Sequence, residues 1–193
     1  MHLTPHLLLN AYYQGVFPMA HDDGNIYWYD PNPRAIIPLD DFHVPRRLAR
    51  VIRRGGFEVR FDFDFRAVIT ACAEPAEGRE KTWINDQIID SYCQLYELGF
   101  AHSVETWIDG QLAGGLYGVS LQGVFAGESM FSRAQDTSKI ALVYLVEHLR
   151  SRGFVLLDTQ FITPHLARFG AIEISRAEYK TRLAKALRVQ TWF

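Results

Sequence analysis

The 193-residue sequence has few cysteines, no long apolar run and almost no net charge. Its two cysteines, Cys72 and Cys93, have no CxxC or metal-like spacing, so we expect two reduced, partly buried thiols. No apolar stretch reaches the roughly 20 residues that a membrane-spanning helix needs. Residues 1–5 lack the basic segment and the cleavage-like site of a secretory signal. These absences predict a cytoplasmic protein without a membrane partner.

The charge and hydrophobicity of the sequence limit the class of protein, and its length limits the number of domains. A net charge of −2 argues against a general nucleic-acid coat protein, and no repeat or low-complexity segment is present. Hydrophobic residues make up 48% of the chain and aromatic residues 13%, so a large core can be buried. The length fits one ordinary domain, or one domain with a small appendage.

The pattern of apolar residues predicts helices that alternate with strands. Asp109-Gly110 is a strong signal for a two-residue hairpin between strands at 101–108 and 111–119, and a third antiparallel strand is expected at 124–129. A long helix is expected over 137–152, followed by an apolar, central strand over 154–159. Other helices are predicted at 5–14, 45–54, 64–73, about 85–98 and 177–187, other strands at 26–29, 35–39, 57–61 and 171–174, and a polar loop at 74–81. The expected fold is α/β with a mixed sheet, residues 1–34 forming a small N-terminal subdomain on a domain of residues 35–193.

Two polar segments interrupt these apolar elements. Glu128 follows the strand-like run Val124-Phe125-Ala126, and Asp158 and Gln160 end the apolar strand. Residues two apart on a strand share a face, so Asp158 and Gln160 can point into one site. Polar groups at the end of a buried strand cost free energy unless they are paired or used. Glu128 and Asp158 are therefore either site residues or groups that cap the strand ends.

Six segments in order carry a resemblance to a known family. The sequence is similar to leucyl/phenylalanyl-tRNA–protein transferases from about Leu8 to Leu187. The matching segments are Gly15-Val16-Phe17-Pro18, Asp30-Pro31-Asn32-Pro33-Arg34-Ala35, Ala101-His102-Ser103-Val104-Glu105, Gly114-Gly115-Leu116-Tyr117-Gly118-Val119, Gly127-Glu128-Ser129-Met130-Phe131-Ser132-Arg133 and Asp158-Thr159-Gln160.

The resemblance implies a fold, a reaction and a site. The family has an acetyltransferase-like (GNAT-type) catalytic domain. It transfers Leu or Phe from aminoacyl-tRNA to the α-amino group of proteins with N-terminal Arg or Lys, which marks them for degradation. Asp158 and Gln160 match the family's catalytic acid and amide, and Glu128 its neighbouring carboxylate. An ester donor and an amine nucleophile need no metal, cofactor or acyl-enzyme, because positioning and oxyanion stabilisation can supply most of the acceleration.

The role of Gln160 has two interpretations. A neutral amide is a very poor base, so we favour a positioning role in which Gln160 binds the attacking amine or the aminoacyl group. The alternative, proton acceptance by Gln160, requires strong polarisation by Asp158. Glu128 and Asp158 can together attract the cationic side chain of the acceptor residue.

Apolar and aromatic residues are needed for the aminoacyl group and the terminal adenine. Nine residues fall at or near positions that the resemblance assigns to these contacts: Trp28, Trp83, Tyr92, Leu116, Phe125, Leu142, Leu145, Leu149 and Leu157. Ordinary core packing is the alternative for each of them, and Trp83 and Phe125, which lie next to polar segments, are favoured for binding. An apolar pocket discriminates by about 1–3 kcal/mol per methylene, so Leu, Phe and Met are expected to overlap as donors.

One predicted helix has a basic face. Five arginines lie between 46 and 54: Arg46, Arg47, Arg50, Arg53 and Arg54. In a chain of net charge −2, this local excess is the best candidate for binding tRNA phosphates by charge and shape. A solvated helix face is the alternative, and Arg133 and Lys139 are secondary candidates.

Two other classes of protein share parts of this pattern. A CoA-dependent N-acetyltransferase needs a glycine-containing loop for the pyrophosphate ahead of a helix, and residues 132–136 contain no glycine. A non-catalytic tRNA-binding module would share the basic helix but would leave Asp158 and Gln160 unexplained. We therefore expect an enzyme, acting as a monomer on aminoacyl-tRNA and protein substrates.

Overall fold

The computed structural model describes residues 3–75 and 82–193. Its helices are α1 (Pro5–Tyr13), α2 (Arg46–Arg54), α3 (Phe65–Ala73), α4 (Asp86–Glu97), α5 (Thr137–Arg152), α6 (Pro164–Ala167) and α7 (Arg176–Ala186). Its strands are β1 (Phe17–Ala20), β2 (Ile26–Tyr29), β3 (Arg34–Ile37), β4 (Glu58–Phe61), β5 (Ala101–Ile108), β6 (Gln111–Leu121), β7 (Val124–Ser132), β8 (Leu156–Gln160) and β9 (Ile172–Ile174).

A mixed seven-stranded sheet forms the centre of the molecule. Its strand order is β4-β5-β6-β7-β8-β3-β9, and β1 and β2 form a separate two-stranded sheet. The β7–β8 pair is parallel and the other pairs of the large sheet are antiparallel. The predicted α/β fold with a mixed sheet is confirmed, as are the hairpin at Asp109-Gly110 and the interior position of β8.

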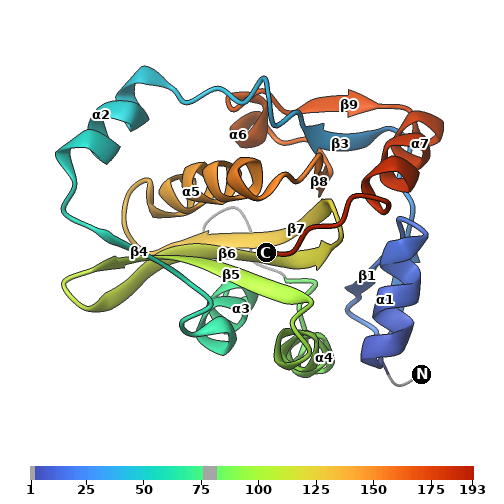
Figure 1. The fold of residues 1–193 in the computed structure, drawn as a ribbon. Helices are drawn as coiled ribbons and strands as arrows, with labels where there is room; N and C mark the ends of the chain where they lie inside the picture. Colours follow the sequence, from blue (N-terminus) through green and yellow to red (C-terminus); the bar gives the residue numbers. More distant parts are fainter. Residues whose placement is uncertain (1–2, 76–81) are drawn as a thin grey trace.

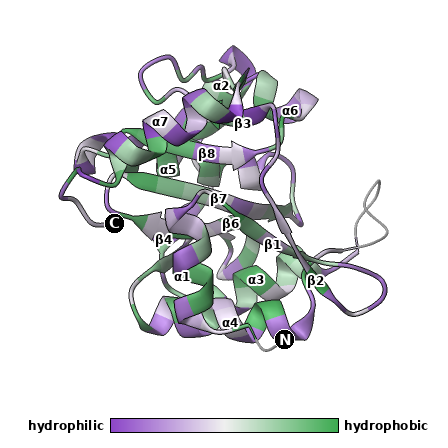
Figure 2. Ribbon diagram, turned by 90° about the vertical axis from the view of Figure 1, so that its right-hand side faces the viewer, coloured by the Kyte–Doolittle hydropathy of each residue, from purple (hydrophilic) through white to green (hydrophobic). Residues whose placement is uncertain are grey.

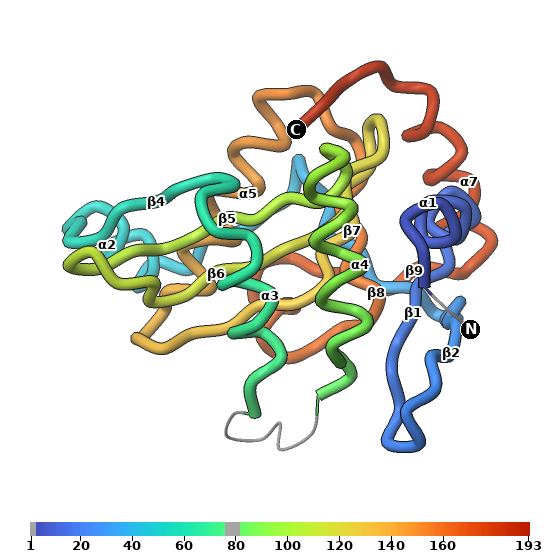
Figure 3. Tube along the Cα trace, turned by 90° about the horizontal axis from the view of Figure 1, so that it is seen from below, coloured from blue at the N-terminus to red at the C-terminus, as the bar shows by residue number. Residues whose placement is uncertain are grey.

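Helices cover both faces of the large sheet. Figure 1 shows α5 and α2 on one side of the sheet and α3 and α4 on the other, with α1 and α7 close together at one end. Seen from below in Figure 3, α3 and α4 cross the strands β5, β6 and β7. Figure 2 shows hydrophobic residues along α5 and the strand beside it. The core is accordingly divided into two apolar clusters, one under α5 and one under α1, α3 and α4.

Local signals explain where the helices begin. Thr4, Asp64, Asn85, Thr163 and Ser175 each cap a helix by accepting a backbone N–H with the side chain. α5 ends at the glycine expected from the sequence, Gly153, in the left-handed conformation. Most of the predicted loop at 74–81 lies outside the described residues. The division into domains at residue 34 stays a prediction.

Candidate active site

Two neighbouring strands separate at the polar segments found in the sequence. β7 and β8 pair in parallel over a short stretch that ends at Ala126 and Asp158. Beyond it, a register shift makes Glu128 the extra residue of β7 against β6, and another makes Thr159 the extra residue of β8 against β3. Bulges bend a strand and change the direction of its side chains. The two bulges face each other and open the space between β7 and β8.

Gly118 of β6 is required beside the first bulge. A Cβ atom on Gly118 would lie 2.3 Å from the carbonyl oxygen of Ala126 and 2.4 Å from the ring of Phe125. Those distances are shorter than any real contact, so another residue there would push β7 away from β6. The glycine therefore allows the close approach that the bulged strand needs.

An apolar cavity of about 300 Å³ lies in the space between the strands. β6, β7, β8, α5 and the segment that follows β8 contribute its walls. The lining residues are Leu116, Tyr117, Gly127, Glu128, Ser129, Met130, Leu142, Leu145, Leu157, Thr159, Gln160, Phe161, Thr163, His165 and Leu166. Such a cavity, apolar with a few polar groups in its wall, is typical of a small-ligand site.

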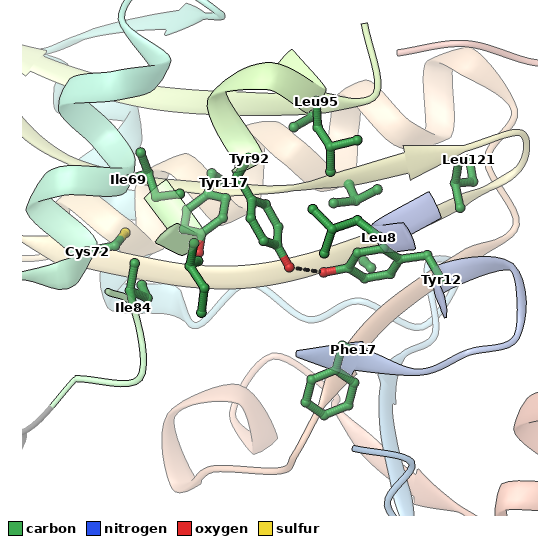
Figure 4. Close-up of a cluster of buried hydrophobic side chains, with 14 of the residues drawn as sticks. Leu8, Tyr12, Phe17, Ile69, Cys72, Ile84, Tyr92, Leu95, Tyr117 and Leu121 are labelled. Carbon is green, nitrogen blue, oxygen red and sulfur yellow. Dashed lines mark hydrogen bonds between the residues drawn. The ribbon is translucent and has the colours of Figure 1, made fainter. Parts of the chain in front are cut away.

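The carboxylate of Glu128 and the amide of Gln160 are in direct contact at the cavity wall. Gln160 Nε2 donates a hydrogen bond to Glu128 Oε1 at 3.0 Å, and the Tyr92 hydroxyl lies 3.5 Å from Glu128 Oε2. Tyr92 in turn shares a hydrogen bond with Tyr12 (Figure 4), so residues of α4 and α1 meet beside Glu128. Among residues 3–75 and 82–193, Glu128 is bonded to the Gln160 side chain through Nε2, which leaves the side-chain carbonyl oxygen of Gln160 as an acceptor.

Burial makes Glu128 a weaker acid than an ordinary glutamate. Desolvation raises the pKa of Glu128 to about 8, and repulsion from Asp158 adds to the rise, while the hydroxyls of Tyr12 and Tyr92 and the charge of Arg34 offset part of it. Burial also raises the pKa of both tyrosines well above the ordinary value, so they remain donors. Near neutral pH, Glu128 therefore exists in both protonation states, as a group that gives and takes a proton must.

Asp158 is enclosed in protein and does not line the cavity. Arg34 binds it in a bidentate pair, Nε to Oδ1 at 2.9 Å and Nη2 to Oδ2 at 2.6 Å. The Tyr179 hydroxyl donates to Oδ2 at 2.8 Å, and the backbone N–H of Gln160 donates to Oδ1 at 3.0 Å. Asp158, Gln160 and Glu128 are thus connected by hydrogen bonds in one cluster. Of these three residues, Gln160 and Glu128 line the cavity and Asp158 lies behind them.

The predicted apolar contacts fall into three groups. Leu116, Leu142, Leu145 and Leu157 line the cavity. Tyr92, Phe125 and Leu149 are fully buried behind it, Phe125 stacked on Phe193. Trp28 and Trp83 are partly exposed and border two other hollows, with Leu3 and Gln87 around the first and Met19 to Asp23 around the second.

The five predicted tRNA-binding arginines are all exposed on α2. Arg47 is also bound to a buried partner, Asp136, at 2.8 Å, and Lys139 binds the same carboxylate at 2.6 Å. Asp136 therefore fastens α2 to the start of α5. Arg46, Arg50, Arg53 and Arg54 face solvent along the helix.

Several residues of the site were not predicted from the sequence. Arg34 and Tyr179 hold Asp158, Tyr12 supports Tyr92, and Phe161 and His165 line the cavity. Arg34 stands in one of the matching segments, but a lone arginine after a turn carries no signal of its partner 124 residues away. No three metal-ligating side chains gather at one place within residues 3–75 and 82–193. Within the same ranges, every helix is too short or too polar to cross a membrane.

The fold and the site define an α/β protein with an apolar cavity beside a carboxylate of raised pKa and an amide. Comparison with known proteins specifies this class. Residues 36–184 match the family model described as leucyl/phenylalanyl-tRNA protein transferase, and residues 1–32 match the model of its N-terminal domain.

Curated relatives match over nearly the whole chain. The leucyl/phenylalanyl-tRNA–protein transferase of Herpetosiphon aurantiacus is 61% identical over 99% of this chain and 98% of its own length. That of Paramagnetospirillum magneticum is 56% identical over 99% of this chain and 92% of its own. Among solved structures, a GCN5-related N-acetyltransferase from Kribbella flavida matches with a TM-score of 0.45 and 12% identity, over 88% of this chain and 60% of that one.

The chain belongs to the leucyl/phenylalanyl-tRNA protein transferase family. It is an aminoacyltransferase.

Proposed function

We propose that the enzyme transfers Leu, Phe or Met from aminoacyl-tRNA to the α-amino group of proteins that begin with Arg or Lys, marking them for degradation. The observation that carries the proposal is the apolar cavity with Glu128 and Gln160 in its wall. A cavity of this size can hold one Leu, Phe or Met side chain, and Glu128 and Gln160 in its wall are available for the ester and the amine.

The donor side chain would occupy the leucine-lined part of the cavity. Leu116, Leu142, Leu145 and Leu157 come from three different elements, so their positions are fixed by the core rather than by a loop. Burial of a Leu or Phe side chain there is worth about 1.5–3 kcal/mol. Charged and polar donor side chains are disfavoured because the leucines offer them no hydrogen-bond partner.

The acceptor amine would be handled by Glu128 and Gln160. The Gln160 carbonyl oxygen accepts a hydrogen bond from the amine and aligns it with the ester carbon. As the C–N bond forms, the carboxylate of Glu128 takes the proton from the nitrogen. It then returns the proton to the ribose oxygen as the ester C–O bond breaks. An α-amino group has a pKa of about 7.7–8.0, close to the raised pKa of about 8 of Glu128, so the proton moves between groups of similar basicity.

The rest of the tRNA would contact α2. Its four solvent-facing arginines supply charge for phosphates, and Asp136 holds the helix through Arg47. Trp28 and Trp83 are the candidates for stacking on the terminal adenine. We propose that the enzyme acts as a monomer, in the cytoplasm where aminoacyl-tRNA is made.

The cavity assignment is tested by narrowing it with Leu142→Phe. The larger Phe side chain should lose more affinity than Leu, so kcat/KM for Phe-tRNA should fall about ten-fold relative to that for Leu-tRNA. The ratio of kcat/KM for Phe-tRNA to kcat/KM for Leu-tRNA serves as an internal control, because a general loss of folding or of tRNA binding lowers both values equally. An unchanged ratio would mean that the aminoacyl group binds elsewhere.

A further inference from the structure

The carboxylate oxygens of Asp158 already accept hydrogen bonds from the protein and are not free to bind a substrate. Arg34, Tyr179 and the backbone of Gln160 together occupy both of its oxygen atoms, and Asp158 and Arg34 are each only 1% exposed. A carboxylate enclosed in this way cannot receive the cationic side chain of an incoming protein. Its charge acts on Glu128 from a distance, and its geometric effect on the cavity wall passes through Gln160, the lining residue that is hydrogen-bonded to it.

Gln160 needs external support to keep its conformation. Its φ of +59° lies in the left-handed region, which is unfavourable for a residue with a side chain. It also follows the bulge at Thr159. The hydrogen bond from its N–H to Asp158 Oδ1 holds the backbone in this conformation, and the side chain then meets Glu128. The orientation of the amide in the cavity is therefore set by the position of the Asp158 carboxylate.

Arg34 holds that carboxylate with two nitrogen atoms of its guanidinium group, and the third nitrogen atom binds the backbone. Nε and Nη2 bind Asp158, while Nη1 donates to the carbonyl oxygen of Gly15 at 2.9 Å. The group lies against the rings of Phe17 and Tyr179, at 4.9 Å and 4.2 Å from their centres. Burial alone would lower the pKa of Arg34, but its bonds to Asp158 outweigh burial and the pKa lies above the ordinary value. A buried charge pair is expensive unless geometry and hydrogen bonds are complete, as they are here.

We propose that Arg34 and Tyr179 are positioning residues for the transfer reaction, which fix Asp158 so that it holds Gln160 in its left-handed conformation against Glu128. This inference rests on the proposed function of the cavity. Neither residue touches a substrate. Gly15 and Phe17 extend the same support into the N-terminal segment, so the segment that precedes β3 helps to shape a site whose reacting groups lie on β7 and β8.

The test is a double-mutant cycle between Tyr179→Phe and Gln160→Ala. Tyr179→Phe removes one hydroxyl and preserves the ring against Arg34. In the otherwise unchanged enzyme it should lower kcat about ten-fold, with KM for aminoacyl-tRNA changed less than two-fold. In the Gln160→Ala background the same substitution should have no further effect on kcat, because the group through which it acts is gone.

Two further variants keep the test decisive. Arg34→Lys retains the charge but not the bidentate geometry, and it should lower kcat more than Tyr179→Phe. The control is Arg150→Lys, which disrupts the bonds of an arginine outside the site to the carbonyl oxygen of Leu39 and should leave kcat unchanged. A ten-fold effect of Tyr179→Phe that persists in the Gln160→Ala background, or no effect in either, overturns the inference. Absence of transfer by the unmodified enzyme would instead contradict the proposed function.

Discussion

The role proposed for Glu128 depends on its surroundings. The same carboxylate on the surface would be ionised at neutral pH, whereas desolvation by burial raises its pKa to about 8 in spite of the opposing hydrogen bonds from Tyr12 and Tyr92. The raised pKa also makes the free energy of unfolding depend on pH, because the folded protein holds this proton more tightly than the unfolded chain does.

Glu128→Gln should therefore change how stability depends on pH. In the unmodified protein, the stabilising effect of the protonated carboxyl is complete below the unfolded value of 4.5 and is lost as the pH rises through about 8. We expect the free energy of unfolding to fall with rising pH in this window more steeply than in Glu128→Gln, which has no proton to lose. Urea titrations at pH 5, 7 and 9 measure the difference. Parallel curves for the two proteins would contradict the raised pKa.

Asp158→Asn should destabilise the fold rather than act only on turnover. The substitution removes the hydrogen-bonded counter-charge of the buried Arg34 guanidinium and leaves only Asp30, 4.0 Å from Nη1; breaking a buried pair in this way typically costs about 3–5 kcal/mol. The control is Asp90→Asn, which breaks an exposed pair with Arg66 and should cost less than about 1 kcal/mol. Chemical denaturation compares the two. Similar small losses for both variants would show that the Arg34 pair is not the anchor described above.

The sequence identifies the polar residues of the site but not their partners. Glu128, Asp158 and Gln160 stand out because polar side chains follow apolar strands. Strand alternation alone places Asp158 and Gln160 on one face, whereas the bulge at Thr159 and the positive φ of Gln160 separate their roles. Bulges depend on how neighbouring strands pair, and the one local sign of them is Gly118, whose position allows β7 to approach β6.

At the scale of elements, α2 combines exposure with charge. Predicted as a basic helix, it lies at the edge of the molecule, and Figure 1 shows it far from α7 at the opposite end. Its attachment to α5 through Arg47 and Asp136 could not be derived from the sequence, which shows only an acid ahead of a helix. The long elements α5, β5 and β6 were predicted closely because their periodicity extends over many residues and their ends carry turn signals.

Replacement of Arg50 and Arg53 together by Ala should weaken tRNA binding without affecting the chemistry. We expect KM for aminoacyl-tRNA to rise and its logarithmic salt dependence to lose about one to two units of slope, with kcat within two-fold of the unmodified value. The matched control is Arg66→Ala with Arg182→Ala, two exposed arginines that form ion pairs elsewhere. An unchanged salt slope would remove α2 from the tRNA-binding surface.

At the scale of the whole molecule, the site depends on parts of the chain that are distant in sequence. Tyr12 and Gly15 come from the N-terminal segment, Arg34 from β3, Glu128 from β7 and Tyr179 from α7. Figure 2 shows α1 and α7 on the same side of the molecule, where these contacts converge. The groups around the cavity thus depend on contacts from the whole fold, including those of the N-terminal segment.

The most direct measurement of the central claim is transfer of radiolabelled Leu from Leu-tRNA to two model proteins that differ only in their first residue, Arg or Ala. The account predicts that label enters the protein beginning with Arg, at its α-amino group, and that the protein beginning with Ala stays unlabelled. Equal labelling of both would contradict recognition of the N-terminal side chain. No labelling of either, with Leu-tRNA still bound, would contradict the acyl transfer itself.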